Sequence, residues 1–185
     1  MSVAMRQATM DDAAEISALI DESVHGLCAA DYSVRVIEAA LKSAWGLDTQ
    51  LLRDGTYYLL TLDGMVATCG GWSFRSTLFG SDAITTRDSS VLVPGRDAAH
   101  IRAFFVKPAF ARRGLGSLLL TRCEMAAWHA GFRSLSLGAT EPGRRLYRKH
   151  GYREGRPLNY DLGQGQMMEV VPMFKSLKSP LVAGS

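Results

Sequence analysis

One twelve-residue segment, Val106-Lys-Pro-Ala-Phe-Ala-Arg-Arg-Gly-Leu-Gly-Ser117, constrains the fold of this chain more than any other. The apolar run over residues 98–106 predicts a strand, and Pro108 ends it because proline has no backbone donor for a ladder. After the glycines, apolar residues recur at three- and four-residue steps up to Gly131, which is typical of an amphipathic helix that begins at about Gly114. The segment therefore predicts a strand, a basic glycine turn and a helix.

Such a turn is suited to an anion. The first amides of a helix have no internal partner and lie at the positive end of its dipole, and Arg112 and Arg113 add charge beside them. By itself the pattern is weak, because many helices follow a glycine turn without binding a ligand. The segment contains no Gly-x-x-x-x-Gly-Lys-Ser/Thr motif, and Leu119 breaks the dinucleotide motif Gly-x-Gly-x-x-Gly.

A second stretch lies about thirty residues further on. Residues 135–140 alternate as a strand does, and Glu141-Pro-Gly-Arg-Arg-Leu-Tyr-Arg-Lys-His-Gly-Tyr152 reads as a short helix stopped by Gly151. Together the two stretches resemble the GCN5-related N-acetyltransferases, whose signatures are Arg/Gln-x-x-Gly-x-Gly/Ala and Leu-Tyr-x-x-x-Gly-Phe/Tyr. The first signature reads Ala111-Arg-Arg-Gly-Leu-Gly116 here, so Ala111 stands where the family usually has Arg or Gln.

The resemblance implies an α/β (α+β) fold with a mixed, mostly antiparallel sheet of six to seven strands and about four helices. A wedge between the fourth and fifth strands would bind acetyl-CoA as co-substrate, without a metal. In the family, pantetheine pairs with the strand backbone and the diphosphate rests on the glycine turn. The corresponding cofactor-binding residues are Phe104, Phe105, Val106, Arg112, Arg113, Gly114, Leu115, Gly116 and Ser117.

The same resemblance assigns the catalytic acid to Tyr147, which would protonate the departing thiolate after direct attack by the amine. The base is open between Glu141, His100 and a water chain. Glu141 also suits the first turn of a helix, and His100 also suits the end of a loop. Asp31, Tyr32 and the polar segment over residues 75–97 are candidates for contacting the acceptor.

Composition favours one globular domain over residues 1–175, followed by a frayed tail over residues 176–185. Cys28, Cys69 and Cys123 are widely spaced, which argues against a disulfide framework or a zinc site. A net charge of +3, without a long basic run, argues against nucleic-acid binding. No apolar run of bilayer length and no signal peptide is recognised, so we expect no membrane contact and a cytoplasmic location.

The remaining elements follow from local patterns. We expect a strand over residues 3–8, then a helix from a cap at Thr9 to residue 24 and another over residues 33–45. Residues 56–62 and 65–74 predict a hairpin, since Asp63-Gly64 is a strong turn dipeptide. Residues 75–97 read as a mobile loop over a site or a disordered excursion. A final strand over residues 166–174 could pair two copies of the chain, as family members do in forming homodimers.

Two functions are compatible with these features. The first is transfer of an acetyl group from acetyl-CoA to a primary amine of a small molecule or peptide. The alternative is a CoA-binding regulatory protein of the same fold without efficient turnover, which Ala111 and the lack of a carboxylate on the strand around Ile101 would explain.

Overall fold

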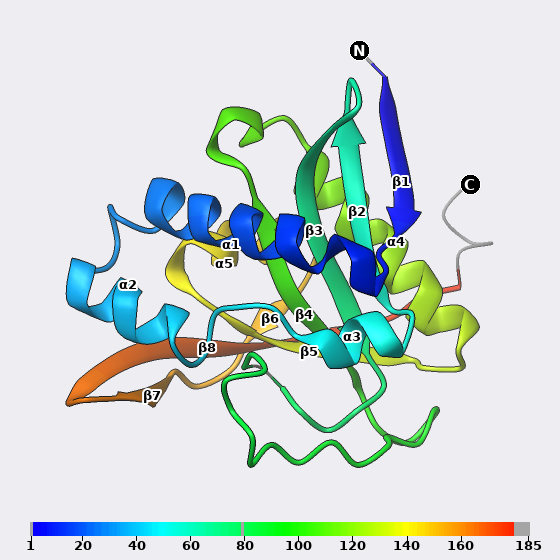
Figure 1. Ribbon diagram of the computed structural model, residues 1–185. Coiled ribbons are helices and arrows are strands. Elements are labelled where there is room, and N and C mark those ends of the chain that lie inside the picture. Colours follow the sequence, from blue (N-terminus) through cyan, green and yellow to red (C-terminus); the bar gives the residue numbers. More distant parts are fainter. Residues whose placement is uncertain (1, 79, 180–185) are drawn as a thin grey trace.

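A computed structural model describes residues 2–78 and 80–179 (Figure 1). Within them the chain forms an eight-stranded sheet. Its strands are β1 (Val3–Gln7), β2 (Tyr57–Leu62), β3 (Met65–Ser73), β4 (Ala99–Val106), β5 (Ser134–Ala139), β6 (Arg153–Glu154), β7 (Leu158–Gly163) and β8 (Gln166–Ser176). The described α-helices are α1 (Ala13–Leu27), α2 (Val34–Leu41), α3 (Thr49–Arg53), α4 (Leu115–His129) and α5 (Glu141–Lys149).

The strands follow the order β1-β2-β3-β4-β5-β8-β6, and β7 pairs with β8 beside this path. Every pairing is antiparallel except that of β4 with β5. Alternate residues of β2 serve opposite faces: Leu59 packs with α1, α2 and α3, whereas Tyr58 packs with α4. The sheet is therefore covered by helices on both sides (Figure 1).

The sheet opens between β4 and β5. These strands pair only at Ala99 with Leu135 and at His100 with Ser136. The cause lies in β4, where Ala103 and Phe104 together face the single residue Gly70 of β3 and Ala103 has a φ of 54°. A bulge of this kind bends a strand and increases its twist, so β4 turns away from β5 beyond His100.

Two contacts hold the bulge. The buried Tyr57 hydroxyl donates a hydrogen bond of 2.7 Å to the Ala103 carbonyl. A Cβ on Gly70 would lie 2.5 Å from Cδ2 of Phe104, so only glycine leaves room for that ring. The wedge predicted between the fourth and fifth strands is thus a built feature of the sheet.

The predicted fold class is confirmed, with differences in detail. The sheet has one strand more than expected, because the short strand β6 and the strand β7 add to the edge around β8. The expected helix over residues 33–45 ends at Leu41, and the separate helix α3 follows. In the tail, β8 runs to Ser176 and the Leu177 amide donates to the Arg133 carbonyl at 2.8 Å, while residues 180–185 lie outside the described residues.

The polar segment over residues 75–97 is fixed at several points in its described part. The Arg75 guanidinium donates to the carboxylate of Asp54 at 2.6 and 2.7 Å, and Leu92 pairs with Phe74 through the backbone at 2.8 Å. The segment contributes Leu78 and Gly80 to a cavity in the wedge. It is therefore a wall of that cavity rather than a disordered excursion.

Candidate functional site

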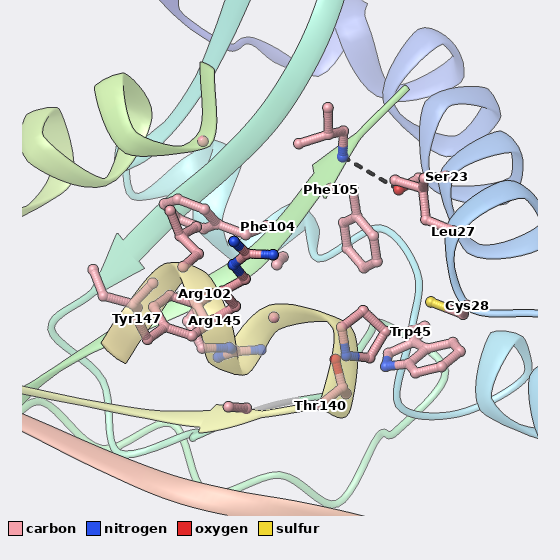
Figure 2. A pocket seen from close by; sticks show the side chains of 18 of the residues that line it. Ser23, Leu27, Cys28, Trp45, Arg102, Phe104, Phe105, Thr140, Arg145 and Tyr147 are labelled. Atoms are coloured by element: carbon pink, nitrogen blue, oxygen red, sulfur yellow. Dashed lines mark hydrogen bonds between the residues drawn. The ribbon is translucent and has the colours of Figure 1, made fainter. Parts of the chain in front are cut away.

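A cavity of about 670 Å³ occupies the wedge between β4 and β5. All residues of β4 from Ile101 to Val106 line it, together with residues from α1, α4 and α5. Because β4 has no neighbour on this side beyond His100, its main chain is left for a ligand to pair with. Figure 2 shows this cavity at close range.

The glycine turn forms one end of the cavity. Arg112 and Gly114 both have left-handed backbone, with φ values of 62° and 81°. The Ser117 and Leu118 amides donate to the Gly114 carbonyl at 3.1 and 3.2 Å, so the amides of Leu115 and Gly116 precede the first intrahelical bond. Anions bind to such groups at the start of a helix.

The residues predicted to bind the diphosphate fall into two groups, those that line the cavity and one that does not. Arg112, Gly114, Leu115, Gly116 and Ser117 line the cavity. Arg113 is not among the lining residues; its guanidinium lies 5.6 Å from the centre of the Phe110 ring. At Ala111 the backbone amide donates to the Pro108 carbonyl at 3.2 Å, so the main chain closes the turn without an arginine or glutamine side chain.

The predicted pantetheine residues Phe104, Phe105 and Val106 also line the cavity. Phe104 lies toward Tyr147, whereas the Phe105 ring lies toward α1 and Trp45 (Figure 2). The Val106 amide donates to the Ser23 hydroxyl of α1 at 3.2 Å. A ligand that pairs with this amide must therefore displace or share the bond to Ser23.

Tyr147 projects from α5 into the middle of the wedge. It is 8% exposed, and its ring makes edge contacts with Phe104 and Tyr152 at centroid distances of 6.4 and 5.7 Å. Burial, with a smaller contribution from Cys123, raises the pKa of Tyr147 well above its ordinary value. The phenol therefore stays protonated at neutral pH and can act as a proton donor.

Neither candidate base reaches the cavity. The His100 Nδ1 lies 2.6 Å from the Ser136 hydroxyl, at the last paired position of β4 and β5. Burial and the nearby Arg102 lower the pKa of His100 to about 4. Glu141 has an exposed side chain and forms an ion pair with Arg144. Within residues 2–78 and 80–179, no aspartate, glutamate or histidine side chain lines the cavity.

The other end of the cavity is apolar. Phe105 and Trp45 face each other across it, and the Cys28 sulfur points between them (Figure 2). Asp31 and Tyr32 are not lining residues, but Tyr32 makes an edge contact with Trp45 at 5.6 Å and its hydroxyl accepts from the Glu141 amide at 3.0 Å. This bond joins the α1–α2 connection to the start of α5.

Sequence reasoning missed several lining residues because they come from separate segments and carry no shared motif. They are Ser23, Leu27, Cys28, Trp45, Leu78, Arg102, Thr140 and Arg145. For Arg102 a signal was available, since an arginine within an apolar strand needs a buried partner. That partner is Asp48, whose Oδ2 lies 2.7 Å from Nη2 of Arg102 and 3.0 Å from Nη1 of Arg87.

The cysteines are not activated as nucleophiles. Burial raises the pKa of Cys28 to about 11 and that of Cys69 to about 12. Among the described residues, no group of three or more His, Cys, Asp or Glu side chains is placed to hold a metal ion. In the same part of the chain, every helix is too short or too polar to cross a bilayer.

Comparison with known families agrees with this geometry. Residues 53–154, more than half of the 185-residue chain, match the family model of the acetyltransferase (GNAT) domain. The chain belongs to the GNAT family. Membership implies acyl transfer from acetyl-CoA, and the matched range contains the bulge, the glycine turn and Tyr147. No curated protein matches this GNAT chain in sequence.

Solved structures share the fold of this GNAT protein. A GCN5-related N-acetyltransferase from Rhodopseudomonas palustris superposes with a TM-score of 0.71 at 22% identity, covering 96% of this chain and 97% of the other. PaiA N-acetyltransferase from Thermoplasma acidophilum, in complex with coenzyme A, gives 0.64 at 15% identity, covering 96% and 100%. The yncA protein from Salmonella typhimurium, with its cofactor acetyl-CoA, gives 0.62 at 19% identity, covering 97% and 96%.

Proposed function

We propose that this GNAT protein transfers the acetyl group of acetyl-CoA to a primary amine of a small molecule or peptide. The observation that carries the proposal is a single wedge cavity that has a basic helix N-terminus at one end and a buried, protonated tyrosine in its middle. Structures of the same fold from Thermoplasma acidophilum and Salmonella typhimurium contain coenzyme A or acetyl-CoA.

The residues of the wedge fit acetyl-CoA. The free main chain of β4 suits the pantetheine amides, and the amides of Leu115 and Gly116, with Arg112, suit the diphosphate. Arg145 and Lys149, one turn apart on α5, line the same cavity and add positive charge for the remaining phosphate. When bound, acetyl-CoA supplies the thioester that is attacked.

Tyr147 is the proposed acid. As the amine nitrogen bonds to the acetyl carbon, the carbon–sulfur bond breaks and the electron pair stays on sulfur. The Tyr147 hydroxyl gives its proton to that sulfur and is later reprotonated from water. A raised pKa keeps the phenol protonated beforehand, and burial among Phe104 and Tyr152 fixes its ring.

The amine must lose a proton. An alkylamine with a pKa of about 10.4 is neutral in only about one molecule in two thousand at pH 7. Because an apolar surrounding penalises the charged form, the wall formed by Phe105 and Trp45 lowers this pKa. No carboxylate or imidazole lines the cavity in the described part of the chain, so water takes the proton.

The second candidate function is CoA binding without turnover, and the lack of a lining carboxylate is the observation that favours it. Release of CoA from acetyl-CoA, measured against alkylamines, arylalkylamines, amino acids and peptide N-termini, separates the two. We expect amine-dependent release together with acetylated product. Acetyl-CoA binding without release across the panel would favour the regulatory protein, and failure to bind acetyl-CoA would exclude both.

A further inference from the structure

We infer that the acceptor is an apolar monoamine, meaning one primary amine on an uncharged aliphatic or aromatic body. This inference rests on the proposed function and names the substrate class for the same site. It depends on which side chains the acceptor end of the wedge offers, and on which of the nearby charges are already paired.

The acceptor end is lined by apolar surface from four separate segments. Leu27 and Cys28 come from α1 and its end, Trp45 from the α2–α3 connection, Leu78 from the segment after β3, and Met168 and Val170 from β8. Trp45 is 7% exposed, Met168 2% and Val170 4%, so these walls are already packed from behind. An apolar ligand body replaces water against them without disturbing any hydrogen bond.

Within the described residues, the acidic groups of this region do not line the cavity. The carboxylate of Asp48 is buried and accepts from Arg102, Arg87 and the Gln50 amide, and it does not line the cavity. Asp31 is exposed and is not a lining residue. Asp54 is paired with Arg75.

The lining cations offer a second ammonium no counter-charge. Arg102, Arg112, Arg145 and Lys149 contribute to the cavity wall, and the carboxylate of Asp48 that pairs with Arg102 does not line the cavity. Arg112, Arg145 and Lys149 are assigned to the phosphates of acetyl-CoA, and within the described residues no carboxylate lines the acceptor end. A diamine entering with one amine toward Tyr147 would bring its second charge into this apolar region, and desolvation opposes such binding.

The sharpest test uses two acceptors of equal chain length, pentylamine and cadaverine, which differ by one terminal ammonium. We expect the purified protein to acetylate pentylamine with a kcat/KM at least about tenfold above that for cadaverine, a difference of about 1.4 kcal/mol. Phenethylamine should be at least as good as pentylamine, because Trp45 and Phe105 offer aromatic faces.

A charge placed in the wall should reverse the preference. Cys28 is half-buried with its sulfur in the cavity, so Cys28→Asp adds a carboxylate there, and Cys28→Ser is the matched neutral control (Figure 2). We expect Cys28→Asp to shift the pentylamine-to-cadaverine ratio toward cadaverine by about tenfold, equal to about 1.4 kcal/mol. Cys28→Ser should leave the ratio within about twofold of the unaltered protein.

The outcomes separate the two levels of inference. Equal or better use of cadaverine by the unaltered protein overturns the apolar monoamine while leaving acetyl transfer intact. No CoA release with any amine, despite bound acetyl-CoA, overturns the proposed function and this inference with it. If Cys28→Asp fails to fold, as judged by circular dichroism and acetyl-CoA affinity, the ratio in the unaltered protein still decides.

Discussion

The two ends of the wedge are built in different ways. At the cofactor end, the glycine turn and α5 both come from one part of the sequence, residues 111–149. The turn presents backbone amides to the cavity. At the acceptor end, side chains from α1, the α2–α3 connection, the segment after β3 and β8 meet in space. The first end depends on local backbone geometry, whereas the second depends on the packing of the whole fold.

This difference implies that the two ends can change separately. A change in the turn should alter acetyl-CoA affinity for every acceptor, whereas a change around Trp45 should alter the choice of acceptor. Tyr147 lies between the ends and should affect the chemical step. Each of the following substitutions tests one side of this division.

The largest effect is expected from Asp48→Asn, because it leaves the Arg102 guanidinium buried without its counter-charge. Both residues are 4% exposed, and losing one partner of such a pair costs about 3–5 kcal/mol of unfolding free energy. Urea unfolding measures the loss. Asp82→Asn is the control. The distance between the Asp82 carboxylate and the Arg87 guanidinium is 3.6 Å, and the Asp82 side chain is 41% exposed. We therefore expect this variant to lose less than about 1 kcal/mol of unfolding free energy.

Asp48→Asn also tests whether a change near the acceptor end of the wedge leaves the cofactor end unaffected. In the folded fraction, acetyl-CoA affinity should change by less than about threefold while the KM for the amine rises, because Asp48 supports the segment that carries Leu78 and Gly80. Equal losses in both constants would contradict the separation.

Tyr147→Phe should reduce kcat by about ten- to a thousandfold and leave acetyl-CoA affinity nearly unchanged, because only the proton donor is removed. Steady-state kinetics and equilibrium binding measure the two effects. Tyr152→Phe is the matched control: its ring packs against Tyr147, but it does not line the cavity, so we expect its kcat to stay within about threefold. An unchanged rate in Tyr147→Phe would refute the acid role.

Mild acid should lower the free energy of unfolding through His100, which lies at the last paired position of β4 and β5. Burial and Arg102 lower the pKa of His100 from 6.5 to about 4. Between pH 6.5 and 4, the imidazole therefore binds a proton in the unfolded chain but not in the folded chain. The contribution of neutral His100 to the free energy of unfolding is complete above pH 6.5. It is lost as pH falls toward 4, and the loss is of the order of 2 kcal/mol. Urea unfolding at pH 7, 5.5 and 4.5 measures it.

His100→Asn is the comparison for this pH effect, since it retains a polar group opposite Ser136 and removes the titration. Burial also lowers the pKa of His150, so part of the pH dependence should remain in that variant. A slope identical to that of the unaltered protein would show that His100 does not carry the effect. The variant should keep its kcat at pH 7, because His100 does not line the cavity.

The smallest effect is expected from Arg112→Ala, which should weaken acetyl-CoA binding about tenfold, or about 1.4 kcal/mol, with the loss shrinking at high salt. Arg113→Ala is the control, because Arg113 lies over Phe110 outside the cavity, and we expect a change below about threefold. Equal losses from the two would indicate a general electrostatic field rather than a contact of Arg112. Isothermal titration at two salt concentrations separates these cases.

The glycine turn and the helix after it could be predicted from the sequence because their determinants are local. Glycine at position 114, proline at 108 and the apolar spacing of α4 each act within a few residues, and the hairpin at Asp63-Gly64 is specified in the same way. The bulge in β4 was not predicted. The sequence carries two features at this point, the Phe104-Phe105 pair in β4 and Gly70 on the opposite strand, and neither says which strand bends.

The acceptor end could not be predicted, because contacts such as Asp48 with Arg102 join residues 54 positions apart. The polar segment after β3 was interpreted as a mobile loop over a site or a disordered excursion for the same reason: the residues that anchor it, such as Asp54 for Arg75, lie outside the segment. The helix α3 did leave a local sign, since the Asp48 carboxylate caps it by accepting from the Gln50 amide at 3.1 Å. That sign was not recognised.

The bulge at Ala103 has one more consequence, which concerns self-association. Beyond His100, β4 is an unpaired strand edge in the middle of a sheet, and exposed edges of this kind invite pairing with other chains. Here residues of α1 and α5 line the cavity beside the edge, and the Tyr32 hydroxyl joins the α1–α2 connection to the start of α5 by accepting from the Glu141 amide. Because residues of both helices line the cavity beside this edge, a second chain that paired with β4 would have to enter between α1 and α5.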